Sequence, residues 1–254
     1  MKKTKRAIAL FAWIAIVITS FTGCTTHNKQ DPYKDMSAKT IYEKGKQQAL
    51  DGKYKDAITD FEAVETRFPY GEFTNKSQLA LIHAYYKNHE TASALAAADR
   101  FIRTHPTHAN IDFAYYMKGV INYDANFSII YHLFPLNRSK RDPSLARQSF
   151  DDFKVLLEKF PKSPYAADAR QRMIHLRNQL AEHELHIANY YMTKEAYLAA
   201  ANRAGYIVNQ FSTTKSVEPA LMIMIKAYHA LGMQELANDA EKLLTNNFPK
   251  KANS

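Results

Sequence analysis

The sequence contains one cysteine, Cys24, in 254 residues, and only seven glycines. A single cysteine excludes a disulfide within the chain and a metal cluster built from cysteines. No glycine-rich phosphate loop and no nucleophile elbow is present. The core must therefore come from apolar packing alone. No residue pattern resembles an active site, so we predict no catalytic residues, no metal and no cofactor.

The N-terminal apolar run, Ala7 to Phe21, is too short at 15 residues to span a membrane. It follows four basic residues, which is typical of a secretory signal. The run ends in Phe21-Thr22-Gly23-Cys24, which resembles a bacterial lipobox, although Phe21 replaces the usual Leu-like residue. We predict a signal peptide at 1–23 and lipid attachment at Cys24, where more than one acyl chain gives stable anchoring. The alternative is an ordinary signal peptide followed by an unused thiol.

Residues 24–37 are polar and predict a flexible tether between the lipid and the fold. Thr25 follows the cysteine, and the resemblance to Gram-negative lipoproteins implies outer-membrane sorting, because aspartate is the usual retention signal there. The formal charge of the whole chain is +9. This excess suits anionic partners or a phospholipid surface without selecting either. Export from the cytoplasm argues against nucleic acid.

The stretch Ile41 to Pro69 combines two amphipathic patterns that meet at Asp51-Gly52. Its second half places apolar residues at helical spacing, from Tyr54 through Phe61 to Val64. Glycine can end the first helix in the left-handed region, and Pro69 stops the second. Gly-x-Tyr, then Ala-x-x-x-Phe, then Pro is the tetratricopeptide (TPR) signature.

The same signature recurs along the chain. A step of 37 residues from Pro69 reaches Pro106, and a similar unit ends at Pro161. We predict an all-α protein, an α-solenoid of about five TPR helix-turn-helix repeats. Repeats one to three occupy 38–161, a helix and repeats four and five occupy 162–250, and 251–254 is a tail.

Two stretches break the repeat. Residues 122–142 insert an apolar, aromatic run into repeat three. It either folds back to cap the core or forms part of a ligand site or a membrane contact. Residues Ser163 to Leu180 predict a solitary amphipathic helix between hairpins.

The first helix of each TPR hairpin turns one face toward the groove of the superhelix. In repeats one to three this face combines lysines with aromatic residues, which suits an extended peptide with apolar side chains and a negative group. In the alternative interpretation, the tyrosines only cap the core. The predicted peptide-binding residues are Tyr42, Lys46, His83, Tyr86, Lys87, Tyr116 and Tyr123, and the same face includes Lys39, Lys76, Leu79, Phe113 and Val120.

Two histidine pairs, His105/His108 and His183/His186, have a spacing that can supply two metal ligands. Zinc normally takes three or four ligands, and the His-Glu-x-x-His spacing is not met. The hypothesis that the protein is a metal-dependent hydrolase therefore depends on these two histidine pairs alone. We interpret them as turn residues and a polar helix face.

Several local strings make a more specific match than the repeat does. These strings are Arg67-Phe-Pro-Tyr-Gly71, Ala84-Tyr-Tyr-Lys-Asn88, Asp99-Arg-Phe-Ile-Arg103, Asn110-Ile-Asp112, Arg138-Ser-Lys-Arg-Asp-Pro143, Tyr190-Tyr191 and Asn202-Arg203. In these strings the chain resembles the BamD family, TPR lipoproteins of the outer-membrane β-barrel assembly machinery.

The resemblance implies a periplasmic scaffold held by its lipid on the inner leaflet of the outer membrane. It implies binding of unfolded barrel proteins, through their C-terminal targeting segments, in the N-terminal groove. It also implies binding of BamA through the C-terminal repeats, with Arg203 in the contact, alongside other lipoproteins of the complex. The insert departs from the family in being more apolar. A TPR lipoprotein that recruits cell-wall enzymes or peptidoglycan remains the second hypothesis, since anchor and solenoid would be the same.

Overall fold

The computed structural model describes residues 31–126 and 142–249. The chain divides into two units, Met1–Met36 and Ser37–Ser254. The described part of the first unit, 31–36, forms a turn in which the Lys34 amide donates to the Asp31 carbonyl. The predicted signal peptide, the predicted lipid-attachment residue Cys24 and the C-terminal tail lie outside the described residues.

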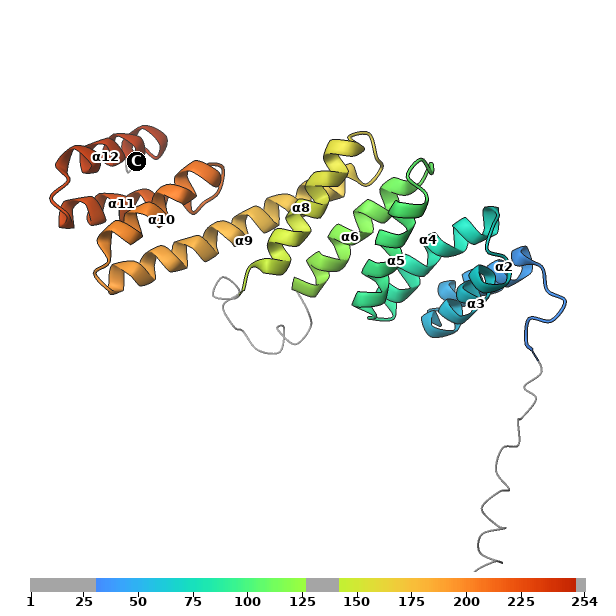
Figure 1. Ribbon diagram of the computed structural model, residues 1–254. Helices are drawn as coiled ribbons and strands as arrows, with labels where there is room; N and C mark the ends of the chain where they lie inside the picture. The colour runs from blue at the N-terminus through green and yellow to red at the C-terminus, as the bar shows by residue number, and fades with distance from the viewer. Residues whose placement is uncertain (1–30, 127–141, 250–254) are drawn as a thin grey trace, which may run out of the picture. The chain divides into compact units, whose positions relative to one another are not determined.

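The described part of the second unit is all-α, as predicted, and contains ten helices that form five antiparallel hairpins (Figure 1). Each hairpin packs on the next one along the chain. The helices are α2 (Ala38–Leu50), α3 (Tyr54–Arg67), α4 (Glu72–Lys87), α5 (Thr91–Thr104), α6 (Ile111–Asn126), α8 (Ser144–Lys159), α9 (Ala166–Thr193), α10 (Tyr197–Gln210), α11 (Val217–Ala230) and α12 (Gln234–Asn247).

The backbone of the hairpin turns repeats with the predicted step. Gly52 and Gly232 have φ values of 76° and 71°. The equivalent positions in repeats two and four are His89 (φ 62°) and Glu195 (φ 58°). A left-handed residue at one repeat position reverses the chain each time, whether or not that residue is glycine.

In four of the five described hairpins the second helix ends as the prolines predict, whereas α10 ends before Phe211-Ser212. The helices α3, α5, α8 and α12 each end two residues before proline, with one aromatic residue or histidine between. The amide of that intervening residue still donates to the helix, for example Phe68 to the carbonyl of Val64. Proline cannot continue the pattern because it has no N–H.

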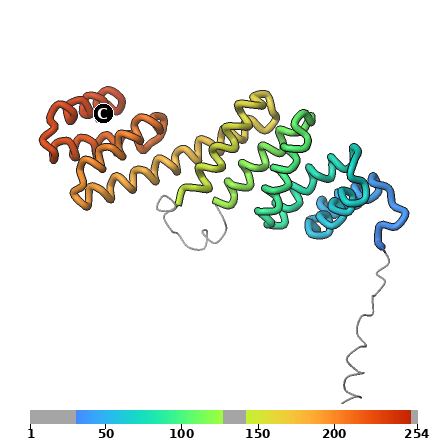
Figure 2. The backbone as a smooth tube through the Cα atoms, viewed as in Figure 1, coloured from blue at the N-terminus to red at the C-terminus, as the bar shows by residue number. Residues whose placement is uncertain are grey.

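The first helices of consecutive hairpins contact one another, and the two helices of one hairpin pack closely on each other. The first helices form a row in which α2 contacts α4, α4 contacts α6, α6 contacts α9 and α9 contacts α11, and Figure 2 shows the hairpins following one another. Within a hairpin, the helices approach closely at glycine. A Cβ built on Gly119 of α6 would lie 2.5 Å from the ring of Phe153 of α8, and one on Gly45 would lie 2.9 Å from Phe61.

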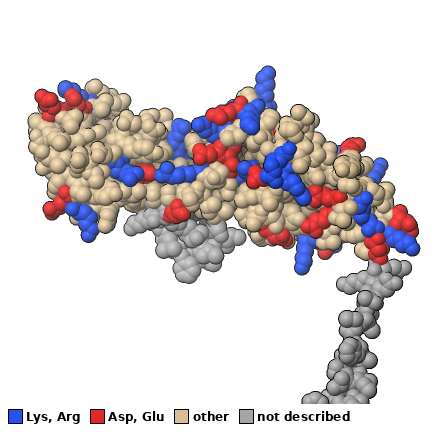
Figure 3. Space-filling view, viewed as in Figure 1, with Lys and Arg blue, Asp and Glu red and all other residues tan. Residues whose placement is uncertain are grey.

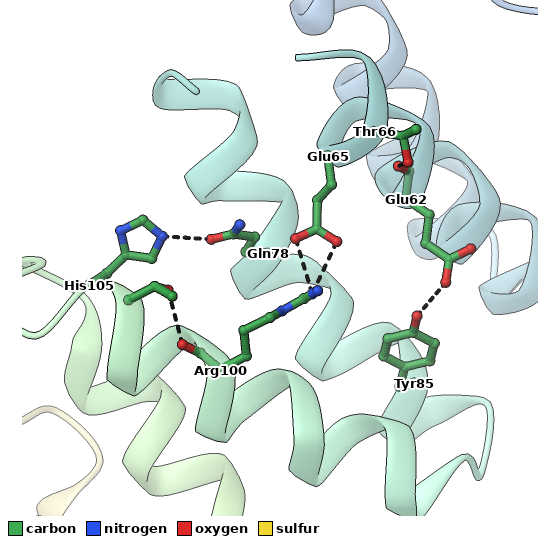
Figure 4. Close-up of polar contacts among 8 residues, drawn as sticks. Glu62, Glu65, Thr66, Gln78, Tyr85, Arg100 and His105 are labelled. Atoms are coloured by element: carbon green, nitrogen blue, oxygen red, sulfur yellow. Dashed lines mark hydrogen bonds and ion pairs between the residues drawn. The ribbon is translucent and has the colours of Figure 1, made fainter. Parts of the chain in front are cut away.

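Polar contacts join the first hairpin to the second (Figure 4). The Arg100 guanidinium of α5 lies 3.0 Å from both carboxylate oxygens of Glu65 on α3. The Tyr85 hydroxyl of α4 donates to Glu62 of α3. Burial and the neighbouring Glu62 carboxylate raise the pKa of Tyr85. These contacts fix the stagger between repeats, which apolar packing alone specifies less sharply.

The structure differs from the sequence-based expectation in two places. Helix α6 runs through Asn122, where we expected the insert to begin, and ends at Asn126. The buried amide of Asn122 donates to Asp152 of α8 at 2.7 Å, which keeps this turn helical. Residues 127–141 lie outside the described residues, so both interpretations of the insert stay predictions.

The second difference is α9. The solitary helix expected at Ser163–Leu180 is wrong, because α9 continues without interruption from Ala166 to Thr193 and becomes the first helix of repeat four. Its buried residues Leu176, Leu180 and Glu184 extend across the predicted boundary. None of the described helices has both the length and the apolar character that a membrane span requires.

Candidate peptide-binding face

The predicted peptide-binding residues all lie on the first helices α2, α4 and α6, which pack side by side. On α2, Tyr42 is half-buried, and its ring lies 5.7 Å from the ring of Phe73 on α4. Lys46 is exposed one turn further along α2, with its ammonium 3.7 Å from Glu43. Lys76 of α4 lies over the Phe73 ring at 5.1 Å. This end of the face therefore combines partly exposed rings with cations.

The middle of the face is formed by α4. His83 and Tyr86 are half-buried and their rings are 6.4 Å apart. Burial, followed by the charge of Lys87, lowers the pKa of His83, so this imidazole stays neutral at pH 7. Lys87 is exposed, and its ammonium lies over the Tyr86 ring at 5.5 Å. Within the described residues no carboxylate lies within ion-pair distance of Lys87.

The tyrosine hydroxyls are bound to carboxylates rather than to water alone. Tyr86 donates to Asp124 of α6, and Tyr116 donates to Asp168 of α9 at 2.8 Å. Burial first, and these hydrogen bonds second, raise the pKa of both Tyr86 and Tyr116 to about 12. Both hydroxyls therefore remain protonated donors across the physiological range.

Arg172 of α9 joins these groups. Its Nε lies 2.6 Å from Asp168 and its Nη1 lies 3.8 Å from Asp124. Its guanidinium lies 4.7 Å from the centre of the Tyr123 ring. The structure thus brings Tyr86, Tyr116 and Tyr123 to one arginine. With two aspartates beside it, that arginine is already neutralised.

Sequence reasoning did not identify Arg172, Asp124 or Asp168. Asp168 and Arg172 are four residues apart on one helix, a spacing that favours an ion pair and was the available signal. Val120, placed by the repeat register on the groove face, is buried at 5% exposure in the cluster around Phe153. The packing of α6 on α8 within this cluster covers the position.

Arg203 of α10 takes part in a different arrangement, around the buried carboxylate of Glu184. The Arg203 Nη1 lies 2.8 Å from Glu184 Oε2, and the Arg147 Nη2 of α8 lies 2.9 Å from Glu184 Oε1. The Glu184 side chain is 1% exposed, whereas those of Arg147 and Arg203 are 48% and 37% exposed. Glu184 therefore holds two half-exposed arginines in fixed positions and leaves part of each guanidinium at the surface.

The histidine pairs occupy separate places. His105 Nε2 donates a hydrogen bond to Gln78 Oε1 at 2.7 Å (Figure 4). The His105 ring lies 4.8 Å from the Phe101 ring. His183 and His186 line a surface pocket of about 550 Å³ together with Tyr190 and Tyr191. Among the described residues, no group of three possible metal ligands is present.

Comparison with known proteins identifies the family. The outer membrane lipoprotein family YfiO matches residues 34–243. The outer membrane protein assembly factor BamD of Neisseria meningitidis serogroup A is 37% identical over 235 residues, which cover 91% of this chain and 88% of that protein. The chain belongs to the BamD family. The BamD protein of Vibrio cholerae is 34% identical, over 90% of this chain and 94% of its own length. The BamD protein of Haemophilus influenzae is also 34% identical, over 98% of this chain and 93% of its own length.

Membership of the BamD family makes the chain an outer-membrane lipoprotein, as the sequence predicted. The BamD relatives are named for assembling outer-membrane proteins, and they come from Gram-negative bacteria. Among solved structures, a thermophilic TPR protein of Thermus thermophilus is similar over 85% of this chain and 93% of its own, with 15% identity and a TM-score of 0.38.

Proposed function

We propose that this BamD-family chain is a non-enzymatic scaffold for outer-membrane β-barrel assembly. It binds the C-terminal targeting segments of unfolded barrel proteins on the face formed by α2, α4 and α6. It binds BamA through its C-terminal repeats, with Arg203 in the contact, alongside other lipoproteins of the machinery. The lipid on Cys24 holds it at the inner leaflet of the outer membrane, facing the periplasm.

One observation supports the peptide site most strongly, the arrangement on α4. Lys87 has no acidic partner among the described residues, and it stands beside the half-buried rings of Tyr86 and His83. A targeting segment that ends in an aromatic residue offers a ring and a free carboxylate close together. Lys87 can take the carboxylate while the rings take the aromatic side chain.

The neutralised Arg172 has a supporting part in this proposal. Because Asp124 and Asp168 already accompany it, Arg172 is poorly suited to receive a further carboxylate. It holds the tyrosine rings in place, which lowers the entropy lost on binding. On the same face Lys46 pairs with Glu43 and Lys76 pairs with Glu72, so among the described residues of α4 Lys87 is the cation that remains available for the peptide.

The assignment is tested with a ten-residue peptide that ends in phenylalanine. We expect the peptide with a free C-terminal carboxylate to bind about tenfold more tightly than its amidated form, since one charge-assisted contact contributes roughly 1.5–3 kcal/mol. Lys87→Gln should weaken the free-acid peptide to the level of the amide and leave the amide unchanged. Fluorescence anisotropy with the labelled peptides measures both affinities.

Lys55→Gln is the matched control, because Lys55 is an exposed lysine on the second helix α3, away from the face. It should leave both affinities unchanged. Equal binding of the free-acid, amidated and scrambled peptides would exclude carboxylate recognition by this face.

A further inference from the structure

A polar pocket lies between α8, α9 and α10. Its volume is about 410 Å³, within the range of roughly 300–1,000 Å³ for ligand pockets. None of the predicted site residues lines it. The residues that give it its chemistry are Arg147, Phe150, Asp151, Arg177, Tyr206 and Gln210.

Arg177 is an exposed cation of this pocket that lacks a carboxylate partner among the described residues. Its guanidinium lies 5.8 Å from the centre of the Phe150 ring, so the ring supports one side of it. Its one hydrogen bond among the described residues is a long contact of 3.4 Å to the Thr213 hydroxyl. No carboxylate of the described residues lies within ion-pair distance of it. An arginine held over an aromatic ring without a carboxylate partner is preorganised for a carboxylate.

The pocket is continuous with the arginines around Glu184. Arg147 lines the pocket and is held by one oxygen of Glu184, while Arg203 is held by the other. The buried carboxylate of Glu184 thus contacts two guanidinium groups, those of Arg147 and Arg203. Arg177 adds a third positive charge at the pocket. Figure 3 shows Lys and Arg side chains along α9 on one face, whereas the surface over α10 to α12 is mostly uncharged in that view.

We propose that this pocket binds an acidic side chain on an extended segment of the partner that contacts Arg203. The proposal rests on the proposed function, because it takes that partner to be BamA. The acidic side chain lies between Arg147 and Arg177, and the Tyr206 hydroxyl and Gln210 amide hydrogen-bond to the same segment. Asp151 is exposed at the pocket, where solvent screens its charge.

The chemistry favours a peptide carboxylate over other anions. The rings of Phe150 and Tyr206 line the pocket, together with donors from three helices, Arg147 of α8, Arg177 of α9 and Gln210 of α10. An extended acidic segment can place one carboxylate between the arginines and its backbone against Gln210. The interface then covers α8, α9 and α10 together rather than Arg203 alone.

Arginine footprinting on the unaltered lipoprotein tests this directly. Phenylglyoxal modifies accessible guanidinium groups, and mass spectrometry of the digested chain locates them. We expect modification of Arg177 in the protein alone and at least fivefold less modification in the purified complex with BamA. Arg170, an exposed arginine two turns earlier on α9 and outside the pocket, should be modified equally in both. Equal modification of Arg177 with and without BamA would overturn the proposal.

Charge variants of the full-length protein give the second measurement. Arg177→Glu should weaken BamA binding about tenfold, and Arg170→Glu should leave it unchanged. If Arg203→Glu abolishes binding and Arg177→Glu binds like the unaltered protein, the pocket is wrong and the proposed function stands. If the unaltered protein binds no BamA, the proposed function itself fails.

Discussion

Gly119→Ala should destabilise the repeat unit by about 1–2 kcal/mol net, even though alanine is the better helix former. The added Cβ would lie 2.5 Å from two ring carbons of Phe153, which is fully buried. Overpacking of this kind costs about 1–3 kcal/mol, occasionally more, and outweighs the roughly 0.8–1 kcal/mol gained in helix propensity. At about 2–4 °C per kcal/mol for a domain of this size, the melting temperature should fall by several degrees.

Two other helical glycines make the control. A Cβ on Gly205 of α10 meets only the end of Met224, at 3.9 Å, so Gly205→Ala should stabilise by about 0.5–1 kcal/mol. The stability of Gly45→Ala should lie between those of the other two variants, since a Cβ added at Gly45 would lie 2.9–3.1 Å from Phe61 and Asp60. Thermal denaturation of the three variants, followed by circular dichroism, gives the order. A Gly119→Ala protein as stable as Gly205→Ala would refute the close packing of α6 on α8.

Glu184→Ala should cost about 2–3 kcal/mol of folding free energy. The carboxylate is buried and is the common partner of Arg147 on α8 and Arg203 on α10. Removing it breaks both ion pairs and leaves a cavity in α9. Because the two arginines are partly exposed, water can solvate them again, and the loss stays below that of a fully buried pair. BamA binding should fall as well, since Arg203 loses its fixed position.

Glu182→Ala is the matched control for this change. Glu182 is exposed on the same helix, two residues earlier, and its replacement should change stability by no more than about 0.5 kcal/mol. Denaturant titration of both variants measures the difference. If the two are equally stable, Glu184 does not tie α8 to α10. Replacing Glu184, Arg147 and Arg203 together by Leu and Met should restore much of the stability without restoring BamA binding.

The parts of the fold that were predictable are the locally encoded ones. The left-handed turn at Gly52 and the helix end before Pro69 are each determined by a few neighbouring residues. A repeat of 37 residues therefore predicted the equivalent turns and helix ends further along the chain. The length of α9 was also encoded locally, because neither glycine nor proline occurs between Tyr165 and Thr193. The repeat register predicted that a helix would end at Leu180, but α9 continues through this position.

The contacts that define the candidate sites were not predictable from one sequence. Glu184 meets partners 37 and 19 residues away, and Tyr116 meets Asp168 at a separation of 52. Such pairs depend on how hairpins stack, which periodicity does not specify. The repeat register placed Tyr86 and Lys87 on the first-helix row. Only the structure shows that Lys87 lacks an acidic partner among the described residues while Arg172 has two.

A scaffold with one surface for barrel proteins and another for BamA can be tested most directly by photo-crosslinking in living Gram-negative cells. One strain carries a photoreactive amino acid at Tyr42, and another carries it at Asn202, beside Arg203. Crosslinked partners are identified by mass spectrometry. We predict unfolded outer-membrane barrel proteins at position 42 and BamA at position 202. Murein hydrolases at either position, or the same products at both, would contradict a scaffold with two separate binding surfaces for barrel assembly.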